Sequence, residues 1–128
     1  MGYPIACCWD GARFTGKNGR PIFIFENTVR TAGGRHTFSP CDKVLNALMW
    51  GVLIMAAKIF GCEIYAIHIL STHASYIIGV PDAATHSRFK KWVHGNWARE
   101  ANIRRNRSGS VWGRRAHSIP ILDEESLI

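Results

Sequence analysis

The sequence contains no apolar run long enough to cross a membrane. The longest run covers residues 47–57 and ends at Lys58, so it has 11 residues where a membrane-spanning helix needs about 20. We therefore expect a buried helix at this point and no membrane among the partners. Residues 1–14 also lack a charged start followed by an apolar block, which predicts no secretory signal and a cytoplasmic location.

Cysteine is present, but in no pattern that forms a redox motif or a typical zinc site. The four cysteines are Cys7, Cys8, Cys41 and Cys62. No two of them form a Cys-x-x-Cys pair, and this spacing argues against a four-thiolate zinc site. Without a secretory signal, free thiols in a reducing compartment are the expected state.

Acidic residues are scarce: nine stand against 16 lysines and arginines, which gives a net charge of +7 over 128 residues. The basic excess is concentrated between residues 88 and 115, where the only acid is Glu100. The basic residues of this segment are Arg88, Lys90, Lys91, Arg99, Arg104, Arg105, Arg107, Arg114 and Arg115. Such a segment is typical of a nucleic-acid binder, and the alternative is a basic face in contact with solvent alone.

The rest of the sequence predicts one domain of alternating strands and helices. Residues 1–19 are rich in glycine and polar groups, and we expect a flexible segment there, followed by one domain over residues 20–128. The expected elements are a strand over 21–29, a helix over 40–60, strands over 63–70 and 73–80, a helix over 85–106 and a strand over 117–122. This β-α-β-β-α-β order predicts an α+β, ferredoxin-like (split βαβ) fold with one antiparallel sheet and two helices on one face.

The first expected helix has clear start and stop signals. Ser39 is the expected N-cap, Pro40 the first residue and Gly61 the stop. The residues that recur at helical spacing, and that we expect to face the core, are Val44, Leu45, Leu48, Val52, Met55, Ile59 and Phe60.

The second expected helix carries an apolar row formed by Phe89, Val93 and Trp97. Glu100 falls inside this apolar face, which predicts a buried or half-buried ion pair with an arginine. The side expected to face away from the row carries Lys91, His94 and Arg105.

Histidines stand near the corner between the two middle strands. His73 and Ser75 alternate with Ala74, so they point to the same face, where a His-x-His pair would hold a divalent metal. In this chain a hydroxyl replaces the second imidazole. His68, on the neighbouring strand, is a candidate substitute ligand, and the alternative is a histidine with a packing role. We expect the remaining histidines in loops or at the surface, and these are His36, His86, His94 and His117.

Three segments carry a resemblance to a known family. Residues 69–80 read ILSTHASYIIGV, residues 92–102 read WVHGNWAREAN, and residues 109–115 read GSVWGRR before SIPILDEE at 118–125. In this order they resemble the M-x-N-H-x-H strand, the W-x-x-G-N-W-A-R-E-x-N segment and the G-x-x-W-x-x-R segment of the single-tyrosine transposases of the HUH superfamily. The branch that they resemble is that of the REP-associated tyrosine transposases, from about Phe23 to the C-terminus.

This resemblance implies a fold that cleaves DNA strands. In the family, two histidines and a third polar ligand hold Mg or Mn, and a tyrosine on a later helix attacks the phosphate. His73 matches the first metal histidine, and Ser75 stands at the position of the second. The candidate metal ligands of this chain are therefore His73, Ser75 and His68.

The matching nucleophile lies beyond the last residue of this sequence. The family's tyrosine is on the helix after the last strand, and the chain ends at Ile128, within the first turn of that helix. Tyr3, Tyr65 and Tyr76 do not match that position, and we expect the last two in core-like strands. The expected protein is a prokaryotic, nucleoid-associated and transposase-like one that binds single-stranded or hairpin DNA and lacks its catalytic tyrosine.

The candidate DNA contacts are the basic residues of segment 88–115 together with Trp112. The Trp112 indole would stack on an unpaired base, and the alternative is a core position under the sheet. Two other functions fit the same sequence. One is a non-catalytic regulatory module that binds nucleic acid, and the other is an interaction protein that forms a homodimer. The resemblance implies dimers formed by sheet or helix contacts, and the exposed strand edge of this chain would permit one.

Overall fold

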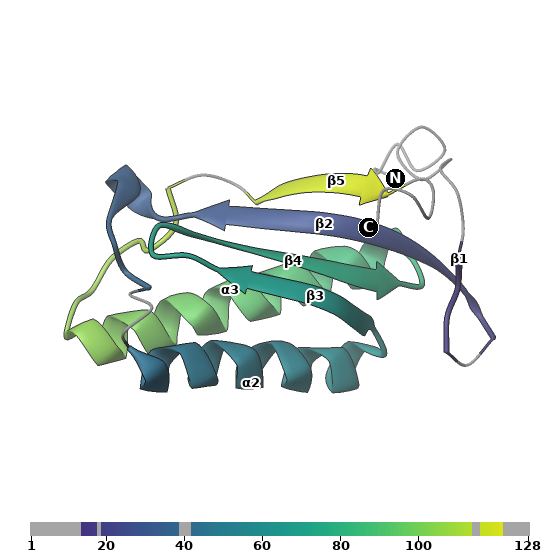
Figure 1. Ribbon diagram of the computed structural model, residues 1–128, viewed down its shortest axis with the longest axis horizontal. Helices are drawn as coiled ribbons and strands as arrows, with labels where there is room; N and C mark the ends of the chain where they lie inside the picture. Colours follow the sequence, from purple (N-terminus) through teal and green to yellow (C-terminus); the bar gives the residue numbers. More distant parts are fainter. Residues whose placement is uncertain (1–13, 18, 39–41, 114–115, 122–128) are drawn as a thin grey trace.

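The computed structural model describes residues 14–17, 19–38, 42–113 and 116–121. Its elements are β1 (Phe14–Thr15), β2 (Pro21–Arg30), the 3-10 helix η1 (Ala32–Gly34), α2 (Lys43–Phe60), β3 (Glu63–Ile69), β4 (His73–Val80), α3 (Ala83–Arg105) and β5 (His117–Ile121) (Figure 1). From β2 to β5 the order β-α-β-β-α-β is the one that the sequence predicts.

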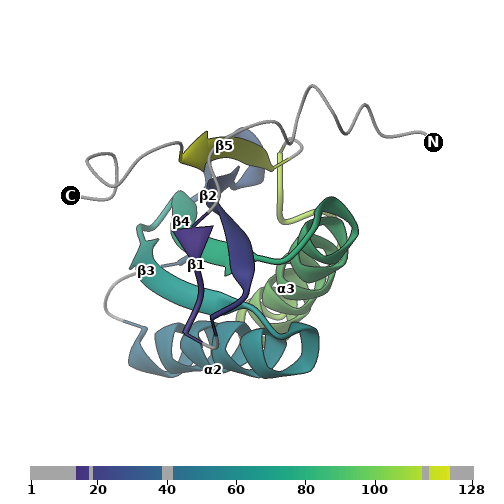
Figure 2. The ribbon, with the colours of Figure 1, turned by 90° about the vertical axis from the view of Figure 1, so that its right-hand side faces the viewer.

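The strands form one antiparallel sheet in the order β1-β2-β4-β3, and β5 pairs with β2. In the centre of the sheet Asn27 lies opposite both Tyr76 of β4 and Ser118 of β5. Figure 2 shows that α2 and α3 lie side by side on one face of this curled sheet. The predicted α+β, ferredoxin-like architecture is therefore confirmed.

A short strand forms where the sequence predicts a flexible segment. Phe14 pairs with Ile22 and Thr15 with Pro21, and the Gly16 amide donates to the Arg20 carbonyl at 2.8 Å. Phe14 also packs against a small apolar cluster of Ile22, Ile24 and Ile121. Residues 14–17 therefore form a paired strand and a turn within the segment for which the sequence predicts flexibility, and residues 1–13 lie outside the described part.

Helix α2 starts at an acidic cap and stops at a glycine. The Asp42 carboxylate accepts a hydrogen bond from the Leu45 amide at 3.1 Å, so Asp42 is the N-cap, whereas the sequence predicts Ser39 in that role. Ser39 itself lies outside the described residues. Gly61 ends the helix with φ of 66°, in the left-handed region that favours glycine, and this prediction is confirmed.

The buried side of α2 differs from the predicted one. Its buried residues are Leu45, Met49, Leu53 and Ala56. Four residues that the sequence places in the core are exposed instead, and these are Val44, Leu48, Met55 and Ile59. Apolar residues surround the whole helix, so helical spacing alone does not tell which stripe packs on the sheet. The expectation of a buried helix is only partly correct: by length and composition α2 could cross a membrane, and only 22% of it is buried.

Helix α3 packs as predicted. Phe89, Val93 and Trp97 are fully buried, and Ala101 continues their row toward the end of the helix. The Trp97 indole donates a hydrogen bond to the Met49 carbonyl of α2 at 2.9 Å. This bond ties the two helices together beneath the sheet.

Candidate nucleic-acid interface

The outward face of α3 carries three of the predicted DNA contacts. The helix begins at Asp82, whose side chain accepts from the Thr85 amide at 2.7 Å, and this hydrogen bond lowers the pKa of that carboxyl. Opposite the buried row, Arg88, Lys91 and Arg99 are exposed. These three residues stand at steps of one or two turns, so they form one strip along the helix, called the basic strip below.

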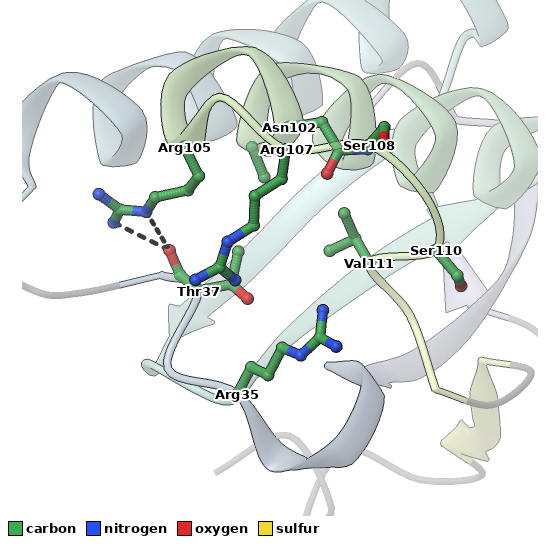
Figure 3. Close-up of a pocket in the computed structure, with 9 residues that line it drawn as sticks. Arg35, Thr37, Asn102, Arg105, Arg107, Ser108, Ser110 and Val111 are labelled. Carbon is green, nitrogen blue, oxygen red and sulfur yellow. Dashed lines mark hydrogen bonds between the residues drawn. The ribbon is translucent and has the colours of Figure 1, made fainter.

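Three arginines meet at the end of α3. Arg105 and Arg107 come from the last turn and the residues after it, and Arg35 comes from the end of η1. Figure 3 shows that the Arg35 and Arg107 side chains extend from opposite sides toward the same space. The depression between them, called the arginine pocket, encloses about 10 Å³. Its other lining residues are Thr37, Ala101, Asn102, Ser108, Ser110 and Val111.

The charges of the arginine pocket are only partly balanced. Asp42 pairs with Arg105 at 3.1 Å and with Arg104 at 3.3 Å. The hydrogen bond from the Leu45 amide and that from Arg104 hold the pKa of Asp42 below its usual value. Within the described residues neither Arg35 nor Arg107 has a carboxylate partner. The pocket therefore keeps a positive charge in a concave site lined by hydroxyl and amide groups.

Arg105 is fixed in place by the backbone. Its guanidinium donates two hydrogen bonds to the Thr37 carbonyl, from Nε at 3.2 Å and from Nη2 at 3.0 Å. Part of the reason for cations at this end of α3 is structural, because they offset the partial negative charge of the helix C-terminus. Arg35 lies on another element, so this explanation does not cover it.

A groove lies between the C-terminal end of α2 and the middle of α3. It has a volume of about 390 Å³ and is lined by Phe60, Arg88, Lys91, Trp92, Gly95 and Asn96. The Phe60 and Trp92 rings meet edge to face, with their centroids 6.4 Å apart. An added Cβ on Gly95 would meet no atom within 4 Å, so the space above this residue is open. The groove thus combines an aromatic floor with two cations that belong to the basic strip.

Several predicted contacts have other surroundings. Lys90 is half-buried, and its ammonium donates to the Ser118 hydroxyl at 3.2 Å, so it faces the sheet. Arg104 lies beside Asp42 as described above. Arg114 and Arg115 lie outside the described residues. Glu100 is half-buried as expected, but it forms no ion pair with any described residue, so the predicted pairing with an arginine is not found there.

Trp112 occupies the second of its two predicted positions. Its indole donates to the His94 carbonyl at 2.9 Å and stacks on Phe38 with a centroid distance of 5.3 Å. Its backbone forms a bridge with Thr31. These contacts hold the ring in a packing role, whereas Trp92 is half-buried and lines the groove.

The candidate metal ligands lie together on the sheet face opposite the helices. His73 and Ser75 alternate with the buried residues Ala74 and Tyr76, so they share this face as predicted. His68 pairs across the strands with Ser75, which confirms that it faces the same side. The Ser75 hydroxyl is 3.1 Å from the Thr28 hydroxyl and hydrogen bonded to it.

This set of donors does not fit the metal that the resemblance implies. The implied site needs two imidazoles side by side on one strand, and here the second position is held by the Ser75 hydroxyl, which is a weak ligand for Mg and is hydrogen bonded to Thr28. Over the described part of the chain, no three His, Cys, Asp or Glu side chains are grouped closely enough to hold a metal ion.

Neither described tyrosine is set up as a nucleophile. Tyr76 is buried, its hydroxyl is 2.8 Å from His94 Nε2, and burial raises its pKa well above the usual value. Tyr65 is 43% exposed and donates to Glu63 at 2.7 Å, and desolvation together with this carboxylate raises its pKa. A phenol with a raised pKa gives little phenolate at neutral pH. The core prediction is correct for Tyr76 and wrong for Tyr65.

Two histidines are packed inside the protein where the sequence predicts loop or surface positions, and of these His86 is buried and His94 half-buried. His86 stacks on Phe25, and its Nε2 is 2.8 Å from Asn27 Oδ1. His94 packs among the rings of Tyr76, Trp97 and Trp112. Burial lowers the pKa of each imidazole to about 3, so both are neutral at pH 7. His86 precedes Phe89 by three residues, so extending the apolar row back by one turn would have identified it.

The other predicted side chains behave as expected. His36 and His117 are exposed, and His36 is 2.8 Å from the Ser71 hydroxyl. Cys62 is a free thiol, as the sequence predicts, and its burial raises its pKa to about 12. This thiol is therefore unreactive at neutral pH. The other three cysteines lie outside the described residues.

Comparison with known proteins gives matches to solved structures alone. No protein-family model and no curated protein matches the chain. A transposase candidate from Deinococcus radiodurans R1 superposes with a TM-score of 0.66 at 15% identity and covers 88% of each chain. A REP-associated tyrosine transposase bound to a REP hairpin superposes with a TM-score of 0.63 at 14% identity and covers 81% of this chain. This chain spans 59% of that transposase. The described part of the chain therefore has the fold of a REP-associated tyrosine transposase.

Proposed function

We propose that this chain is a transposase-like protein of the single-tyrosine HUH type that binds hairpin or single-stranded DNA and does not cleave it. The observation that carries the proposal is the arginine pocket, where Arg35 and Arg107 converge without a carboxylate partner among the described residues. Two guanidinium groups that share a concave space repel each other unless an anion lies between them. A phosphate oxygen at the mouth of the pocket would accept from both groups.

The basic strip extends this site along α3. Arg88, Lys91 and Arg99 provide further cations on the outward face of the helix that ends at the arginine pocket. A row of this kind suits the regularly spaced phosphates of a nucleic-acid backbone. The groove beside Arg88 and Lys91 adds an aromatic floor, to which an unpaired base could bind next to its own phosphate.

A hairpin is the favoured form of the DNA. One of the structurally similar proteins named above is bound to a REP hairpin. A hairpin with a single-stranded tail offers both a double-stranded backbone for the basic strip and unpaired bases for the groove. The alternative function, a regulatory module that binds nucleic acid, would use the same surface. The two functions differ in their natural target, which is the end of a mobile element only for the transposase-like protein.

The lack of cleavage follows from the site on the sheet. In the set His73, Ser75 and His68 a hydroxyl stands at the second position of the His-x-His pair, and both described tyrosines have raised pKa values. We therefore propose that binding needs no divalent metal and that the DNA strand stays intact.

The test is binding to a 5′-labelled hairpin with a single-stranded tail, measured by fluorescence anisotropy with and without Mn, followed by a denaturing gel. The double variant Arg35→Ala/Arg107→Ala should weaken binding by about ten- to a hundredfold, because each phosphate contact contributes roughly 1 kcal/mol or more. The matched control is Lys43→Ala/Lys58→Ala, which removes the same charge from exposed positions on α2. An equal loss of affinity in both double variants would contradict the assignment of the arginine pocket as a phosphate site. A cut strand with covalently attached protein would disprove the absence of cleavage.

A further inference from the structure

The outward face of α2 is the largest exposed apolar feature in the described part of the chain. Over all described residues, ten large hydrophobic side chains are exposed, and six of them belong to α2. They are Val44, Leu48, Trp50, Ile54, Met55 and Ile59, each between 40% and 54% exposed. Together they expose on the order of 600 Å² of mostly apolar surface, at the upper end of the largest patch found on typical monomers. A patch of this size marks an interaction surface.

Five residues of this face form a seam along the helix. The α2 seam consists of Val44, Leu48, Gly51, Met55 and Ile59. These residues recur at steps of four, three, four and four, which is close to the spacing that lets two helices pack along their length. Trp50 and Ile54 lie on the adjoining strip of the exposed face, so the seam has an apolar border on that side as well.

Gly51 stands at the middle of this seam. Helix α2 spans Lys43–Phe60, so its two central residues are Gly51 and Val52. Glycine is unfavourable in the interior of a helix compared with alanine. An added Cβ at Gly51 would nevertheless meet no atom within 4 Å. The packing of this chain therefore gives no reason for the missing side chain, whereas a second helix approaching closely at this point does.

The seam is nearly symmetric about that centre, and this symmetry identifies the partner. In an antiparallel pair of α2 helices related by a two-fold axis near Gly51, Val44 lies against the partner's Ile59 and Leu48 against the partner's Met55. Each contact then joins two aliphatic side chains of similar size. A two-fold interface requires such a self-complementary surface. We propose that the chain forms a homodimer through antiparallel packing of the α2 seam.

The composition of α2 disfavours the other occupants. Its exposed charges are Lys43 and Lys58 alone, near the two ends, so an acidic partner would find few cations along the seam. A helix that lies on a lipid surface carries a polar side opposite its apolar side, and the opposite side of α2 is the core stripe from Leu45 to Ala56. The interface also differs from the strand edge that the sequence suggests as a dimer contact.

Sedimentation equilibrium of the full chain between 1 and 100 µM tests this proposal without any DNA. The expected result is a discrete species of twice the chain mass of 14.4 kDa. The variant Leu48→Glu should weaken association by at least tenfold, and circular dichroism should show that it is still folded because Leu48 is exposed. The matched control is Ile103→Glu on α3, which places the same charge at a position that is 65% exposed and should leave the dimer intact.

A charge-pair variant tests the antiparallel orientation. Ile59→Glu alone should weaken the dimer, and Val44→Lys/Ile59→Glu should restore it, because each new ammonium faces a new carboxylate of the other copy. In a parallel pair like charges would meet and no rescue would occur. A wild-type monomer at every concentration, an association unaffected by Leu48→Glu, or binding to phosphatidylglycerol vesicles in place of self-association would each overturn the proposal. None of these results depends on whether DNA binds.

Discussion

Helices α2 and α3 lie on the same face of one sheet, yet their outward surfaces are opposites. Toward the sheet both present an apolar stripe, Leu45 to Ala56 in α2 and Phe89 to Ala101 in α3. Away from the sheet, α3 carries the basic strip and ends at the arginine pocket, whereas α2 carries the apolar seam. The inward stripes explain the fold, and the difference between the outward surfaces separates the two proposed functions, DNA binding on α3 and self-association on α2.

Removal of the contact that joins the two helices should have the largest effect. Trp97 is fully buried and donates to the Met49 carbonyl, so Trp97→Ala should lower the free energy of unfolding by about 4 kcal/mol. Both outward surfaces should then fail together, with loss of DNA binding and of association. Urea unfolding measures the change, and Trp50→Ala at a 44% exposed position is the control, with a cost below about 1 kcal/mol. A Trp97→Ala protein as stable as the wild type would show that neither surface depends on the contact between Trp97 and α2.

Acid should weaken the inner layer while it leaves the outward cations charged. His86 and His94 have folded-state pKa values of about 3, below the ordinary value of 6.5. The unfolded chain therefore binds protons between about pH 6.5 and pH 3 that the folded chain does not, and stability falls as the pH falls through this window. Two such groups should lower the free energy of unfolding by about 4 kcal/mol between pH 7 and pH 5.

Urea unfolding at pH 7, 6 and 5 measures this dependence. His86→Gln should roughly halve it, and His117→Gln, at an exposed site, should leave it unchanged. A stability that stays constant from pH 7 to pH 5 would contradict the burial of the two imidazoles.

The basic strip should matter for DNA and not for stability. Arg88→Ala/Lys91→Ala removes the two cations beside the groove and should weaken hairpin binding by about tenfold at low salt, or roughly 1.4 kcal/mol. The free energy of unfolding should change by less than about 0.5 kcal/mol, since both residues are exposed. Anisotropy and urea unfolding of the same preparations give the two values. An unchanged affinity would restrict the interface to the arginine pocket.

The smallest expected effect concerns the glycine in α3. A Cβ at Gly95 would meet no atom within 4 Å, so Gly95→Ala should stabilise the helix by about 0.5–1 kcal/mol. The methyl group would stand at the edge of the groove, so hairpin affinity should stay the same or fall slightly. Thermal unfolding checks the first effect, and a lower melting temperature would show that the groove is more tightly packed than described.

Much of the fold could be predicted from the sequence because its signals are local. Gly61 ends α2, and the row from Phe89 to Trp97 is buried, as periodicity predicts. The inward side of α2 could not be predicted, because apolar residues surround this helix and only the sheet decides that Met49 is buried and Met55 exposed. The strand β1 was missed because its pairing with β2 depends on a turn of polar and glycine residues.

The site was predictable in part for a similar reason. Charge density along residues 88–107 identified the outward face of α3, and alternation placed His73 and Ser75 on one face of the sheet. The sequence did not bring Arg35 to the arginine pocket, since η1 and the end of α3 are far apart along the chain. The sequence also gave Trp112 as a candidate for base stacking. In the structure its indole is hydrogen bonded to the His94 carbonyl and the ring packs against Phe38. Long-range contacts decide both points.

The salt dependence of hairpin binding tests the central claim most directly. The logarithm of the binding constant should fall linearly with the logarithm of the salt concentration, and the slope should be smaller by about 1 to 2 in Arg35→Ala/Arg107→Ala, because two phosphate contacts are lost. An identical slope in the wild type and this variant, or binding that does not depend on salt, would contradict a phosphate site in the arginine pocket.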